Sequence, residues 1–68
     1  MYSTYLDKIK ELRKSKRITQ VEMSKKIGLS ESAYGLYETR QRHMDIDTFV
    51  KVCKILETTP NELLGFDD

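Results

Sequence analysis

Apolar side chains near the start of the chain recur at spacings of four and three residues, as on one face of an α-helix. They are Tyr5, Ile9 and Leu12. A helix with this spacing turns all three toward a core. Thr4 and Asp7 can form a capping box, in which each side chain bonds to the backbone N–H of the other residue. The pattern predicts a first helix over residues 4–14.

A second helix is predicted to start near Gln20. Thr19 is followed three residues later by Glu22, which repeats the capping-box spacing. Gly28 stands where a residue in the left-handed conformation would end the helix. The apolar side chains available for burial are Val21, Met23 and Ile27.

A third helix should follow directly, because Ser30 can cap it and Tyr34 and Tyr37 are spaced to share its inner side. Two helices joined by about three residues must cross steeply. Residues 19–38 therefore have the outline of a helix-turn-helix. Gly35 is costly inside a helix, so it either permits close approach of the backbone to a binding partner or has no functional reason.

The C-terminal part of the chain predicts two more helices. Asp45 can cap a helix that runs to about Leu56. Its apolar stripe consists of Ile46, Phe49, Val52, Cys53 and Leu56. Thr59, Pro60 and Glu62 have the order of cap, first helical residue and capping-box acid. Leu63 should close the core of an all-α, compact five-helix bundle, and residues 65–68 are expected to fray.

The composition of the chain argues against several classes of protein. Sixty-eight residues with 38% hydrophobic and 34% charged side chains form one small globular domain. No apolar run approaches the roughly 20 residues that a bilayer requires, and the first ten residues lack a signal-peptide core, so we expect a cytoplasmic protein. A single Cys53 and a single His43 support neither a disulfide nor a metal site, and no cofactor or small-molecule ligand is inferred. His43 has no neighbouring nucleophile, which argues against an enzyme.

Charge is distributed unevenly along the chain. Residues 1–42 carry ten Lys or Arg against five acids, whereas residues 43–68 carry two against six. The near-neutral total of +1 therefore hides a balance of +5 in the half with the helix-turn-helix and −4 in the other. This polarity is expected if only one face of the protein meets phosphates.

Several short motifs carry a family resemblance. They are LR at 12–13, TQ at 19–20, KKIGLS at 25–30, YE at 37–38 and NELL at 61–64. With these motifs the chain, from about Ile9 to Leu64, resembles the helix-turn-helix domain of the phage repressor and Cro family, also called the XRE family. The resemblance implies a lambda-repressor-like fold whose third helix enters the major groove of double-stranded DNA.

The resemblance also assigns roles to individual residues. The base-reading positions correspond to Glu31, Ser32 and Leu36. Glu31 can accept from cytosine N4, Ser32 can pair with several bases, and Leu36 can contact a thymine methyl. No Arg, Asn or Gln is present on this face for bidentate contact with G or A. DNA shape or arginines in the following loop could then contribute to specificity.

The phosphate contacts implied by the family fall at both ends of the helix-turn-helix. They correspond to Gln20, Thr39, Arg40 and Arg42. Family members usually carry glycine at the position of Arg40. The resemblance further implies a structural salt bridge between Arg13 and Glu38, at the end of the third helix.

One helix-turn-helix reads only a few base pairs, so a repressor of this type is expected to act as a homodimer on a palindromic operator. Apolar residues near the C-terminus that the fourth helix does not consume are candidates for the dimer interface. They are Ile55, Pro60, Leu64 and Phe66. The alternative is a protein-interaction module, antitoxin-like or adaptor, that uses this fold with little or no DNA binding.

Overall fold

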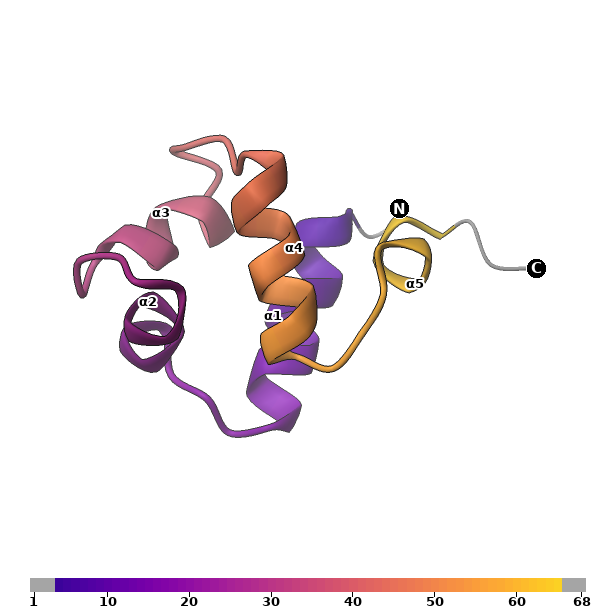
Figure 1. Ribbon diagram of the computed structural model, residues 1–68, viewed down its shortest axis with the longest axis horizontal. Coiled ribbons are helices and arrows are strands. Elements are labelled where there is room, and N and C mark those ends of the chain that lie inside the picture. Colours follow the sequence, from indigo (N-terminus) through magenta and orange to yellow (C-terminus); the bar gives the residue numbers. More distant parts are fainter. Residues whose placement is uncertain (1–3, 66–68) are drawn as a thin grey trace.

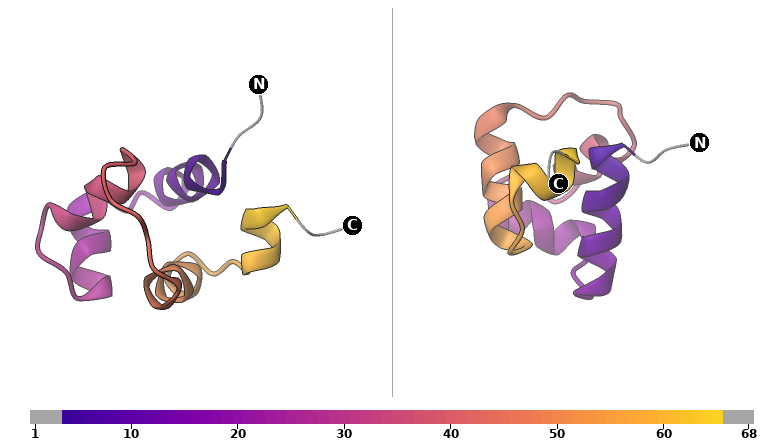
Figure 2. Two further views of the ribbon diagram at one scale, coloured as in Figure 1. Left: turned by 90° about the horizontal axis from the view of Figure 1, so that it is seen from above. Right: turned by 90° about the vertical axis from the view of Figure 1, so that its right-hand side faces the viewer.

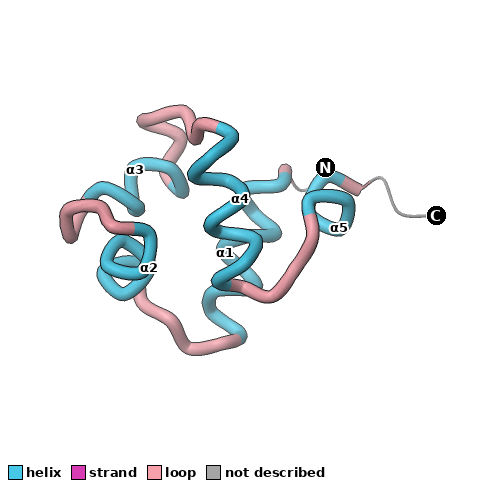
Figure 3. The backbone as a smooth tube through the Cα atoms, in the orientation of Figure 1, coloured by secondary structure: helices cyan, strands magenta, loops and turns pink. Residues whose placement is uncertain are grey.

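Five helices follow one another along residues 4–65, the part of the chain that the structure, a computed structural model, describes (Figure 1). They are α1 (Tyr5–Ser15), α2 (Gln20–Ile27), α3 (Ala33–Glu38), α4 (Ile46–Ile55) and α5 (Pro60–Leu64). No strand occurs among these residues, and loops join the helices throughout (Figure 3). The five-helix, all-α prediction is confirmed.

The helices enclose one core between them. In two perpendicular views α1 and α4 lie on opposite sides, α2 and α3 close one end, and α5 lies at the other (Figure 2). The contacts agree with this arrangement, since α3 packs on α1 and α2, α2 also packs on α4, and α5 packs on α1. The helix-turn-helix formed by α2 and α3 therefore stands at one end of the molecule with one side free.

The core contains most of the apolar residues that the spacing indicated. Its buried members are Ile9, Met23, Ile27, Tyr34, Tyr37, Phe49, Val52, Cys53, Leu56 and Leu63. Tyr5 and Leu12 pack partly buried against them, and the Tyr5 ring meets Phe49 edge to face with centroids 5.6 Å apart. Leu63 closes the core, as predicted.

Two residues of the predicted apolar stripes lie outside the core. Ile46, the first residue of α4, is 72% exposed, because Met44 just before the helix packs against the core at this end of α4. Val21 is 40% exposed, since it stands two positions from the buried Met23 and a helix turns such neighbours to different faces. The predictions that Ile46 and Val21 are core residues are wrong.

Local capping signals are confirmed for α1 and α2, whereas Asp45, predicted to cap α4, stands at its cap position without a side-chain bond to the helix. Thr4 with Asp7 and Thr19 with Glu22 form complete capping boxes, and Gly28 ends α2 in the left-handed conformation at φ 95°. The start of α5 is capped by Thr59 alone. Residues 66–68, for which fraying was expected together with Gly65, lie outside the described residues.

The start of α3 is capped from another helix. Ser30 was predicted to cap it, but the helix begins only at Ala33, and Ser32 at the cap position makes no side-chain bond to it. Instead the hydroxyl of Ser24, fully buried on α2, accepts a hydrogen bond of 3.0 Å from the backbone N–H of Tyr34. The prediction for Ser30 fails because this packing supplies an acceptor that local sequence does not reveal.

Ser24→Ala is expected to lower the free energy of unfolding by about 1–2 kcal/mol, because the N–H of Tyr34 would stay buried without an acceptor. Ser30→Ala is the matched control, since Ser30 is exposed, and it should change stability by less than about 0.5 kcal/mol. Urea unfolding of both variants measures the difference. Equal effects would show that Ser24 does not cap α3.

Candidate nucleic-acid interface

Helix α3 has one buried and one open face. Ala33, Tyr34, Tyr37 and Glu38 are buried, whereas Ser32, Leu36 and Thr39 are exposed and Gly35 is half-buried. The exposed residues recur every three or four positions and therefore share one side of the helix. Of the predicted base-reading residues, only Leu36 lies within α3, because Glu31 and Ser32 occupy the turn before it.

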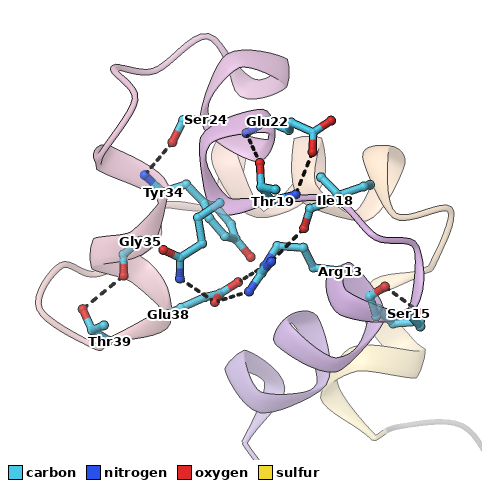
Figure 4. A network of polar contacts seen from close by, with 12 residues as sticks. Arg13, Ser15, Ile18, Thr19, Glu22, Ser24, Tyr34, Gly35, Glu38 and Thr39 are labelled. Atoms are coloured by element: carbon cyan, nitrogen blue, oxygen red, sulfur yellow. Dashed lines mark hydrogen bonds and ion pairs between the residues drawn. The ribbon is translucent and has the colours of Figure 1, made fainter.

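An ion pair anchors the buried face of α3 to α1 (Figure 4). Arg13 Nε lies 2.7 Å from Glu38 Oε2, and Arg13 Nη2 donates to Glu38 Oε1 at 3.1 Å. The two side chains are only 8% and 3% exposed. Arg13 Nη1 also donates to the backbone oxygen of Ile18 at 2.7 Å. The structure thus brings Arg13 and Glu38 together in a two-point contact that also fixes the segment leading into α2.

Gln20, the first residue of α2, joins the same network. Its Nε2 donates to Glu38 Oε1 at 3.0 Å, so the carboxylate receives bonds from both α1 and α2. Tyr34 lies beside this group, with its hydroxyl buried and without a hydrogen bond among residues 4–65 (Figure 4). Three helices therefore meet at one buried carboxylate.

The network sets the protonation of its members. Burial opposes ionisation of Glu38, but the hydrogen bonds from Arg13 and Gln20 outweigh it and lower the pKa of this carboxyl. The bond to Glu38 in turn raises the pKa of Arg13. Burial and the nearby Glu38 carboxylate raise the pKa of Tyr34 far above its usual value. At neutral pH the group contains a charged pair and a neutral tyrosine.

The residues expected at phosphates differ in how free their side chains are. The hydroxyl of Thr39 donates its single hydrogen to the backbone oxygens of Gly35 and Leu36. Thr39 Oγ1 lies 3.1 Å from the first oxygen and 3.3 Å from the second. The guanidinium carbon of Arg42 lies 5.9 Å from the centroid of the Tyr37 ring, and Arg42 has no acidic partner among residues 4–65. Arg42 is therefore the freer of the two arginines in this loop.

Arg40 is attached to the start of α1. Its Nη2 donates to Thr4 Oγ1 at 2.7 Å and to Asp7 Oδ1 at 3.2 Å, in an exposed ion pair. Its backbone has φ 63°, in the left-handed region. Glycine adopts this conformation more easily than arginine, which explains the family's preference for glycine here. The contact with Asp7 offsets part of that cost, and it competes with any phosphate for the guanidinium.

The candidate dimer residues are only partly available. Ile55 is half-buried against the core, Pro60 is exposed and Leu64 is 46% exposed. Phe66 lies outside the described residues. Leu64 also lines an open apolar groove of about 350 Å³. The other lining residues are Tyr5, Met44, Ile46 and Phe49.

Residues 4–65 contain no helix long and apolar enough to cross a membrane. The same residues contain no group of three His, Cys, Asp or Glu side chains placed to hold a metal ion.

Sequence comparison agrees with this geometry. A family model described as helix-turn-helix matches residues 9–63. The chain belongs to this helix-turn-helix family, that of the phage repressor and Cro proteins. Two similar proteins of Bacillus subtilis strain 168 are described as uncharacterized HTH-type transcriptional regulators. YobD is 28% identical over 64 residues and YqaE 33% identical over 60 residues. These stretches cover 94% and 88% of this chain.

The chain spans about half the length of these relatives, 57% of YobD and 52% of YqaE. Among solved structures, the P22 c2 repressor, crystallised with a synthetic operator in the presence of Tl⁺, superposes with a TM-score of 0.82. The two chains are 24% identical, and the match covers 97% of this chain and all of that one. This likeness shows a shared fold. The family comprises DNA-binding regulators rather than enzymes.

Three contacts at the interface were not predicted from the sequence: Ser24 with α3, Arg40 with the cap of α1, and Gln20 with Glu38. Each joins residues at least ten positions apart, so helical spacing gives no sign of it. Ser24 had one available signal, since it stands three positions before the apolar, buried Ile27 and therefore shares a face of α2 with it.

Glu38→Gln is expected to lower the free energy of unfolding at pH 7 by about 3 kcal/mol, because it leaves Arg13 buried without its counter-charge. Glu31→Gln, an exposed change of the same chemistry, should have an effect below about 0.5 kcal/mol. Denaturant unfolding tests both. Similar stabilities of the two variants would contradict a buried ion pair.

The stability of the wild type should also depend on pH through Glu38. The pKa of this group is lower in the folded protein than its ordinary value of 4.5, so its stabilising effect is complete above that value. It is lost as the pH falls through the folded pKa, because the unfolded chain takes up the proton first. The pKa values of Asp7, Glu22 and Asp45 are lowered as well. In acid, the free energy of unfolding of Glu38→Gln should therefore still fall with pH, but less steeply than that of the wild type. An equally steep fall in both proteins would exclude Glu38 as a contributor.

Proposed function

We propose that the protein binds double-stranded DNA sequence-specifically as a transcriptional repressor, with the open face of α3 in the major groove. The observation that carries this proposal is the asymmetry of α3. One face is fixed by a buried ion pair to α1, while Leu36 and the preceding Glu31 and Ser32 remain exposed. A rigid helix with a free face at one end of the molecule is suited to insertion between phosphate backbones.

Only three exposed side chains would be available to contact bases. Among residues 4–65 the side chains of Glu31 and Ser32 make no intramolecular hydrogen bond, so both keep their full capacity for a base edge. Leu36 is 36% exposed and offers only apolar surface, which suits a thymine methyl. Discrimination by these groups is modest, and sequence-dependent DNA shape would supply the remainder.

Phosphate contacts would supply most of the affinity. Gln20 is exposed at the start of α2, where the helix dipole favours an anion, and Arg42 offers an unpaired guanidinium. Arg40 would have to exchange Asp7 for a phosphate. Thr39 would have to give up its bonds to the α3 backbone before its hydroxyl could donate to a phosphate.

A homodimer on a palindromic operator completes the proposal. A single α3 spans only a few base pairs, and two copies related by a twofold axis would read half-sites about 34 Å apart. Pro60 and Leu64 provide exposed apolar surface on α5, at the end of the molecule opposite the helix-turn-helix (Figure 1). Ile55 would contribute only its half-exposed part.

The logarithm of the affinity for duplex DNA should fall linearly with the logarithm of the salt concentration. Arg42→Ala should reduce the magnitude of that slope by about one. Arg40→Ala should reduce it less, because Asp7 already neutralises part of that charge. Lys54→Ala, on the acidic half of the chain, is the control for net charge. Fluorescence anisotropy between about 50 and 200 mM salt measures all four proteins, and a salt-independent Kd would exclude phosphate-based binding.

Selection of bound sequences from random duplex DNA should enrich a palindrome with a fixed half-site spacing. Sedimentation of the selected complex should show two protein copies per duplex. Enrichment of a single half-site by one copy would remove the dimer. If no sequence is enriched and nonspecific DNA does not bind the protein either, the result would instead favour the protein-interaction module. The absence of Arg, Asn and Gln from the reading face is the observation that favours this alternative.

A further inference from the structure

The side chain of Gln20 lies across Gly35. A Cβ atom built on Gly35 would stand 3.0 Å from Gln20 Oε1 and 3.5 Å from its Cδ. The contact with Oε1 is tighter than most contacts of a Cβ atom in proteins, so a side chain at position 35 would require the amide of Gln20 to shift by a few tenths of an ångström. Gln20 in its observed position therefore fits closely over a residue that has no side chain.

Backbone conformation does not explain this glycine. Gly35 lies inside α3, and the described glycines with positive φ are Gly28 and Gly65. Alanine would fit the helical backbone and favour the helix. The reason for glycine at position 35 that the geometry offers is thus spatial, and it comes from Gln20 on α2.

Glu38 holds the other end of the same amide. Its Oε1 accepts from Gln20 Nε2 at 3.0 Å, and Arg13 fixes the carboxylate in turn. A carboxylate only accepts hydrogen bonds, so it selects the nitrogen of the amide and leaves the oxygen over Gly35. The second N–H of Gln20 has no partner among residues 4–65.

We infer that Gly35 and Glu38 are positioning residues for Gln20, which they orient so that its remaining N–H donates to a phosphate oxygen of DNA. This inference rests on the proposed DNA-binding function. A phosphate oxygen, like a carboxylate, only accepts, so the amide serves both anions with its two N–H groups at once. Gly35 then contributes to affinity without touching DNA itself.

A double-mutant cycle tests this coupling. Gly35→Ala should weaken binding to duplex DNA about tenfold when Gln20 is present, the equivalent of one hydrogen bond to a charged group. In the Gln20→Ala background the same change should cost less than about twofold, because no amide remains to be displaced. The thermal midpoint of Gly35→Ala should be nearly unchanged, because the helix preference of alanine offsets the lost bond from Gln20 to Glu38, and this separates positioning from folding. Equal weakening in both backgrounds, or none in either, overturns the inference.

A measurement without DNA decides the geometry by itself. In ¹⁵N–¹H spectra of the free protein, the two amide protons of Gln20 should differ widely in shift, since one faces a carboxylate and the other solvent. Gly35→Ala should bring these shifts together and leave those of Gln41, in the exposed loop, unchanged. Unaltered Gln20 resonances in Gly35→Ala overturn the inference. Failure of the wild type to bind any DNA would reject the proposed function alone, while the spectra would still decide whether Gly35 positions Gln20.

Discussion

The buried contact between Arg13 and Glu38 is the constraint on which the arrangement of the helix-turn-helix depends. Helix α3 has only six residues, too few to be stable alone. Its position comes from three attachments: the ion pair to α1, the bond from Gln20 on α2, and the bond from its Tyr34 N–H to Ser24. Two of these three end on the Glu38 carboxylate. A single ionised group therefore couples the stability of the domain to the orientation of its exposed helix.

A buried charge of this kind contributes to orientation more than to net stability. Desolvation of both ions consumes much of their attraction, so a pair of apolar residues could stabilise the same contact equally well. The apolar pair, however, would give Gln20 no acceptor and would not fix the direction of its amide. The carboxylate is suited to this position because it directs two different donors from two different helices.

The sequence predicted those features whose causes are local. Thr4 with Asp7, Thr19 with Glu22, and Gly28 each act within one helical turn, and the structure contains all three caps. Prediction failed where tertiary packing decided the outcome, as for the capping of α3 by Ser24 and the exposure of Ile46. The candidate site shows the same division. Family resemblance indicated Gln20 and Arg40, but their bonds to Glu38 and Asp7 depend on residues 18 and 33 positions away.

The separation of the two faces of α3 has a consequence for how such a domain can diverge. Glu31, Ser32 and Leu36 take no part in the hydrogen bonds of residues 4–65 through their side chains, and none belongs to the buried core. Substitutions there leave the anchoring network and the core intact. On the proposed function, a duplicated copy of this gene could therefore acquire a new operator through a few changes at these positions, without first gaining stability elsewhere.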